Sequence, residues 1–110
     1  MNDKLIISEI INSINYIDKL TKEKDFNEFK DSLGMETLLN LILEINKNIN
    51  RISFEFKNEH PYINWTIIAN EINYDQVSGS SISIESAWEL ATIKLIDDFL
   101  EKLVNLLNNN

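Results

Sequence analysis

Only two glycines and one proline occur among the 110 residues of this chain. Folds made of many short strands need frequent turns, and turns draw heavily on these two residue types. Their scarcity favours long helices, so we expect an all-α fold, an up-and-down bundle of four or five helices. The length predicts a single domain over residues 1–110.

Charge and composition argue against several classes of function. Asp and Glu total 18 and Lys and Arg total 10, which gives a net charge of -8. Such a chain repels phosphate backbones, which disfavours non-specific binding to nucleic acids and anionic membranes. The absence of Cys excludes disulfides, zinc–thiolate sites and cysteine nucleophiles. No basic-apolar leader or membrane-spanning run is evident, so we expect a cytoplasmic protein without membrane association.

Apolar residues at helical spacing predict the first and last helices. The first is expected from about Asp3 to Thr21. The last is expected to be capped by Ser83 and to run to about Leu107. Because its apolar residues cover more than half its girth, this helix must bury two sides. It would then lie at the centre of the bundle, in a dimer interface, or both.

Two more helices are expected before the single proline. Asp25 and Glu28 fit a capping box that opens a short helix, which Gly34 would end. The apolar side of this short helix would consist of Phe26, Phe29 and Leu33. A long helix is expected from Met35 to about Asn58, although residues 52–57 alternate as a strand would. His60-Pro61 would stop it, because the residue before a proline avoids the α region.

Asn64 is expected to cap a further helix, and a polar loop is expected after it. The apolar residues of that helix would be Trp65, Ile67, Ile68 and Ile72. Residues 76–83 are expected to form a Ser/Gly loop. The loop residues 78–81 could offer hydroxyl and backbone donors to a phosphate, but a flexible connector has the same composition and is favoured.

Few side chains have a spacing typical of catalysis or metal binding. His60 is the only His, and a capping or surface imidazole is favoured over a catalytic one because no partner is visible. With one His and no Cys, no nitrogen- or sulfur-rich metal site is expected within the chain, and no cofactor is expected. Trp65 and Trp88 could stack on bases, but aromatic residues at helical spacing are usually core.

Carboxylates gather at two places on predicted helices. Two of them, Asp97 or Asp98 with Glu101, could share a divalent cation on one helix face. A solvated face is favoured, with lysines four residues away as neighbours. Those lysines are Lys94 and Lys102. Glu55 and Glu59 form a similar pair and receive the same interpretation.

Four segments, taken in order, resemble the HepT-like proteins of the HEPN superfamily. They are Asp3-Lys4-Leu5-Ile6, Asp25-Phe26-x-x-Phe29, Arg51 to Trp65, and Ile84-Glu85-x-x-Trp88. In that family a long helix closes in an Arg-containing apolar turn, a His-Pro follows, and a Trp opens the next helix. The resemblance covers nearly the whole chain.

The resemblance implies an all-α bundle that forms a homodimer. It also implies a ribonuclease toxin paired with a minimal nucleotidyltransferase antitoxin. The family's catalytic signature is an Arg and a His a few residues apart, closely followed by a Tyr. In this chain Glu71 falls near the Arg, Gln76 near the His and Ser78 near the Tyr. Glu71 reverses the charge, and Gln76 cannot shuttle a proton at neutral pH.

Three hypotheses follow from these residues. The first is a degenerate HepT-like protein that has lost its catalytic signature and its ribonuclease activity and acts as a dimeric binding or regulatory module. The second is an active ribonuclease toxin that cleaves RNA with a non-standard site, made of Glu71, Tyr74, Asp75 and Gln76 with a metal. The third is an unrelated helical domain, which a strand over residues 51–57 would support.

Overall fold

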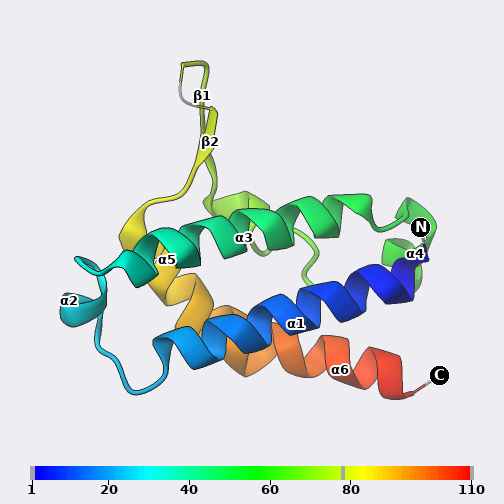
Figure 1. Cartoon of the computed structure of the whole chain (residues 1–110). Coiled ribbons are helices and arrows are strands. Elements are labelled where there is room, and N and C mark those ends of the chain that lie inside the picture. Colours follow the sequence, from blue (N-terminus) through cyan, green and yellow to red (C-terminus); the bar gives the residue numbers. More distant parts are fainter. Residues whose placement is uncertain (1, 78, 110) are drawn as a thin grey trace.

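The computed structural model describes residues 2–77 and 79–109 and is mostly helical (Figure 1). This confirms the predicted all-α helical bundle. The first part of the chain forms α1 (Asp3–Thr21), α2 (Phe26–Phe29), α3 (Leu33–Arg51) and α4 (Phe54–Glu59). A 3-10 turn (Ala69–Glu71) and a hairpin of β1 (Asn73–Asp75) and β2 (Gly79–Ser81) follow. The chain ends in α5 (Ile84–Glu89), a π-helical segment (Leu90–Phe99) and α6 (Leu100–Asn108).

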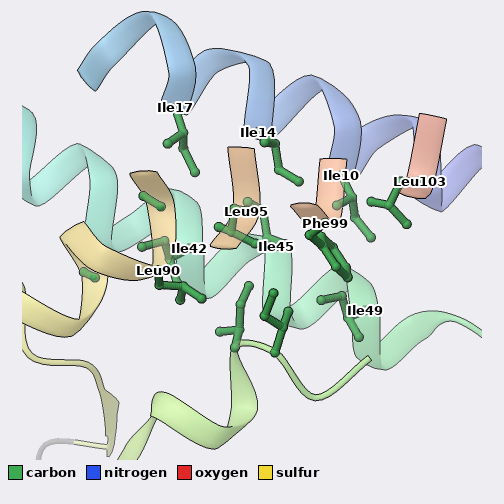
Figure 2. Packing of buried hydrophobic residues seen from close by; sticks show 14 of the residues in the cluster. Ile10, Ile14, Ile17, Ile42, Ile45, Ile49, Leu90, Leu95, Phe99 and Leu103 are labelled. Atoms are coloured by element: carbon green, nitrogen blue, oxygen red, sulfur yellow. The ribbon is translucent and has the colours of Figure 1, made fainter. Parts of the chain in front are cut away.

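The core lies between α1, α3 and the C-terminal helices, which pack side by side (Figure 2). Each contributes one apolar stripe at helical spacing, and the side chains of these stripes are buried. The stripes include Ile10, Ile14 and Ile17 of α1, Ile42, Ile45 and Ile49 of α3, and Leu90, Leu95, Phe99 and Leu103. The last helix packs against both α1 and α3, so its position at the centre of the bundle explains its wide apolar surface.

Both terminal helices begin where the sequence predicts. The bounds of α1 match the expected ones. The side chain of Ser83 accepts a hydrogen bond from the N–H of Ser86 and caps α5 as expected. From Ile84 the helix continues without a break to Asn108, although its middle widens into the π-helical segment, which the sequence did not predict.

The prediction that Gly34 ends the short helix is wrong. Asp25 does cap α2, because its Oδ1 accepts from the N–H of Glu28 at 2.8 Å. The helix ends at Phe29, however, and Gly34 is the second residue of α3. A Cβ at Gly34 would lie 2.9 Å from the buried ring of Phe29, so the site needs a residue without one. Leu33 was expected on the apolar side, but it is exposed.

The single helix predicted over residues 35–58 is divided at Ile52, where the backbone is extended. Ser53 then caps α4 by accepting from the N–H of Phe56 at 3.2 Å. Asp3, at the start of α1, accepts from the Ser53 N–H at 2.9 Å and from its hydroxyl at 2.8 Å. These contacts give the N–H and the hydroxyl of Ser53 hydrogen-bond partners that are not available to them in a continuous helix. As expected, α4 stops before His60-Pro61, and residues 51–57 form no strand.

Replacing Asp3 with Asn should lower the free energy of unfolding by about 1 kcal/mol, since charge-assisted hydrogen bonds to Ser53 are lost at a partly exposed site. The Ser53 N–H, and after it the Ser53 hydroxyl, hold the pKa of the Asp3 carboxyl below its ordinary value of 3.8. The contribution of a carboxylate with a lowered pKa is complete above its unfolded pKa and is lost as the pH falls through the folded pKa. The difference from wild type should therefore be constant above about pH 5 and shrink below the ordinary pKa.

Urea unfolding followed by circular dichroism at several pH values measures this difference. Asp97→Asn is the matched control, because Asp97 is an exposed carboxylate on the last helix. A loss that is equal in the two variants, or that persists unchanged at pH 3, would show that the Asp3–Ser53 contact contributes nothing specific.

The helix predicted from Asn64 does not form. Asn64 Oδ1 instead accepts from both the N–H and the hydroxyl of Thr66, which makes a local turn. Consecutive turns lead to the 3-10 turn, whose C-cap is Ile72 in an extended conformation. Composition is not the reason, because α1 is equally rich in β-branched isoleucine; the Asn64–Thr66 turn takes the place of a first helical turn.

The loop expected over residues 76–83 is partly a hairpin. β1 and β2 are antiparallel, with Tyr74 opposite Ser80 and Asp75 opposite Gly79. Gly79 has a φ of 82°, which glycine adopts without strain. The hairpin projects away from the helices (Figure 1). It is the one place among the described residues where strands pair.

Candidate functional site

Glu71, one of the candidate residues from the sequence, is held by an ion pair. Its Oε1 lies 3.3 Å from the Nζ of Lys94, which belongs to the π-helical segment. Both side chains are partly exposed, so the attraction is modest but fixes the carboxylate against the last helix. Lys94 was expected beside Asp97 and Asp98, and it pairs with Glu71 instead. The base of the hairpin is thereby tied to the last helix.

The other candidate residues of this segment lie on the hairpin. Tyr74 is 77% exposed on β1, and Gln76 is exposed in the turn. No hydrogen bond or ion pair in the described part of the chain joins either of them to Glu71. Ser78 and the side chain of Asp75 lie outside what the structure describes. The described candidates therefore form no cluster in which one group could orient another for catalysis.

A hollow of about 320 Å³ lies beside this segment. Its lining comprises Asn64, Ile67, Asn70, Glu71, Ile93, Lys94 and Asp98. The ammonium of Lys94 is paired with Glu71, and Asp98 adds a second carboxylate. Asp98 is in turn paired with Lys102 at 3.4 Å, so each ammonium at this hollow already has a carboxylate beside it, which disfavours a phosphodiester substrate.

The only Arg and the only His are engaged in separate contacts. Arg51 donates from Nη1 to Asn48 Oδ1 at 2.9 Å and lies 3.8 Å from a carboxylate oxygen of Glu9. His60 caps the end of α4, as the sequence predicted, and its Nδ1 lies 3.0 Å from the hydroxyl of Tyr62. The Tyr62 contact was missed, although a phenol two residues after an imidazole across a proline turn was visible in the sequence.

The carboxylates that could have held a cation have other partners or face solvent. Asp98 lies 3.4 Å from the Nζ of Lys102, one helical turn away, as expected for a solvated face. Glu55 and Glu59 are exposed. Across residues 2–77 and 79–109, no three His, Asp or Glu side chains are placed to share a metal ion.

Both tryptophans pack within the protein, as the sequence predicted. Trp88 lies against Phe29 with ring centroids 5.0 Å apart and against Phe26 at 6.0 Å. Trp65 meets Phe56 edge-on at 6.4 Å, and its indole N–H donates to backbone oxygens. Each is partly buried, and the hollow of about 350 Å³ that Trp88 lines also contains Glu85 and Glu89, whose charges disfavour a nucleic acid there.

Comparisons with known proteins do not assign this chain to a family. No protein-family model, no curated protein and no solved structure matches the chain. Within the described residues, no helix combines the length and the apolarity that crossing a membrane requires. Function must therefore be argued from this chain's own residues and contacts.

Proposed function

We propose that this protein is a dimeric binding or regulatory module: a degenerate HepT-like protein without ribonuclease activity, related to toxin–antitoxin systems. It acts in the cytoplasm as a homodimer. Its partner is a minimal nucleotidyltransferase, which binds the acidic surface of the dimer. RNA is not its substrate.

The ion pair between Glu71 and Lys94 carries this proposal. Cleavage of RNA in the resembling family relies on an Arg that steadies phosphate charge and a His that moves a proton. In this chain a carboxylate takes the position of the Arg and neutralises the nearby ammonium of Lys94. A carboxylate beside a phosphodiester raises rather than lowers the energy of the transition state. The segment therefore lacks the groups that the reaction needs.

The dimer surface is proposed to combine the outer face of the π-helical segment with the hairpin. Ile93 is 58% exposed and adjoins Lys94, which holds the base of the hairpin through Glu71. On the hairpin itself Tyr74 and Val77 are exposed. Exposed apolar and aromatic side chains such as these are available for protein–protein contacts.

Induced expression in a bacterial host tests the loss of ribonuclease activity without any guess about the RNA. The culture should grow as fast as one that carries the empty vector. Light scattering of the purified chain should give twice the 12.8 kDa mass of one copy. Growth arrest that disappears with Glu71→Ala would replace the proposal with the ribonuclease hypothesis. A folded monomer at micromolar concentration would remove the dimeric module.

Ile93→Lys should weaken the dimer by roughly 10- to 100-fold in Kd, because it removes the burial of one large apolar side chain. Because Lys is positively charged, the substitution does not increase the net negative charge of this acidic chain. Leu5→Lys is the matched control, because Leu5 is 54% exposed on α1 and Ile93 is 58% exposed. Sedimentation at several concentrations compares the two variants. Equal effects of the two substitutions would argue that the interface lies elsewhere.

A further inference from the structure

A second hollow, of about 430 Å³, lies where the turn after α4 meets α6. It is built from two segments far apart in sequence, His60 with Tyr62 and the last turns of α6. The residues from α6 are Lys102, Asn105, Leu106 and Asn109. Their spacing of three and four places them on one face of that helix. A volume of this size falls within the range of small-molecule sites.

The polar groups that line this hollow can all donate hydrogen bonds. They are an imidazole, a phenol, an ammonium and two carboxamides. The imidazole is held in place, because His60 Nδ1 bonds to the Tyr62 hydroxyl at 3.0 Å and its ring lies 4.6 Å from that of Phe56. A ring fixed on two sides presents its remaining edge in a defined direction.

Among the described residues no carboxylate lines this hollow, in a chain with 18 acidic residues. The hollow beside the hairpin contains Glu71 and Asp98, and one beside Trp88 contains Glu85 and Glu89. Another at Tyr16, Lys19 and Leu20 also lacks a carboxylate, but one ammonium and one phenol are its polar side chains. The His60 hollow therefore combines the richest set of donors with freedom from lining carboxylates.

Two contacts offset the negative charge around this hollow. It lies at the C-terminal ends of both α4 and α6, where the carbonyl oxygens carry partial negative charge. At the end of α4 the indole N–H of Trp65 donates to the oxygens of Lys57 at 3.3 Å and of His60 at 3.1 Å. Lys102 lies 3.4 Å from Asp98, which is outside the hollow, and its ammonium has three protons, so it can donate to a ligand as well.

We propose that the His60 hollow binds a small phosphate monoester. The phosphate oxygens would accept from Lys102, from the imidazole of His60 and from the carboxamides of Asn105 and Asn109. The organic part would lie on the Tyr62 ring and on Leu106, which supplies apolar surface. This inference does not rest on the proposed function, because neither the dimer surface nor the hairpin takes part in the site.

Titration with phenyl phosphate, followed by ¹⁵N NMR of the full chain, tests the site. Amide shifts should move at His60, Tyr62 and residues 102–109, and inorganic phosphate should bind several-fold more weakly because it lacks a ring. Lys102→Met should weaken binding about tenfold or more, since it removes the full positive charge but keeps an apolar stem. Tyr62→Phe should weaken it a few-fold, because the hydroxyl that holds the His60 imidazole in place is lost.

Lys94→Met is a closely matched control on the same helix. Lys94 is 45% exposed and 3.3 Å from its carboxylate, against 41% and 3.4 Å for Lys102. It should bind phenyl phosphate like wild type, and unchanged circular dichroism spectra establish that each variant is folded. Absence of shifts at the site in wild type, or equal loss in the two lysine variants, would overturn the proposal. Tighter binding of a single-stranded oligonucleotide than of phenyl phosphate at this hollow would also overturn the proposal.

Discussion

Phe99→Ala is expected to lower the free energy of unfolding by about 3–5 kcal/mol, a large part of the stability of a domain of this size. The ring is 1% exposed at the end of the π-helical segment. Figure 2 shows it close to Ile10, Ile49 and Leu103, which come from three different helices. Removing it leaves a cavity where these helices meet, and close-packed helices relax only partly into such a space.

Urea unfolding followed by circular dichroism measures the loss caused by Phe99→Ala. Leu33→Ala provides the contrast, because Leu33 is 87% exposed at the start of α3. That change should alter the free energy of unfolding by less than about 0.5 kcal/mol. A loss below about 1 kcal/mol for Phe99→Ala would mean that the three helices do not share one core around this ring.

Periodicity in the sequence was sufficient to predict the long helices and their buried stripes. The apolar residues of α1 and of the last helix repeat at helical spacing over many turns, and tertiary packing uses that same spacing. Local caps were also predictable, since Asp25 and Ser83 each bind an N–H three residues later. These features depend on neighbours in sequence, which is why a single sequence shows them.

The errors had both distant and local causes. The break at Ile52 depends on Asp3, which is 50 residues from Ser53 and binds its N–H. The role of Gly34 depends on the position of the nearby Phe29 ring rather than on helix termination. The helix expected after Asn64 failed because a local turn at Thr66 outweighed an apolar periodicity that is short.

The candidate site divides in the same way. The sequence showed the reversed charge at Glu71, but its partner Lys94 lies 23 residues further along the chain. The segment Lys102 to Asn109 has the spacing of one helix face, yet its meeting with His60 follows only from how α6 packs. The sequence therefore shows which chemical groups the candidate sites can contain, whereas the pairs that these groups form depend on how the helices pack.

Trp65→Ala is expected to lower the free energy of unfolding by about 2–4 kcal/mol. Its indole joins the end of α4 to the turns that follow, because it donates to the oxygens of Lys57 and His60 and meets the Phe56 ring. The stretch after Pro61 has few regular hydrogen bonds, so this side chain does much to hold it. Circular dichroism during urea unfolding measures the loss without relying on tryptophan fluorescence.

Trp65→Phe separates the two contributions of the indole. It keeps an aromatic ring against Phe56 but removes the N–H, so it should cost about 1 kcal/mol, close to one hydrogen bond. Equal losses in Trp65→Phe and Trp65→Ala would assign the whole effect to the two carbonyl contacts. A loss below about 0.5 kcal/mol in both would contradict a structural role and return Trp65 to the residues available for stacking on a ligand.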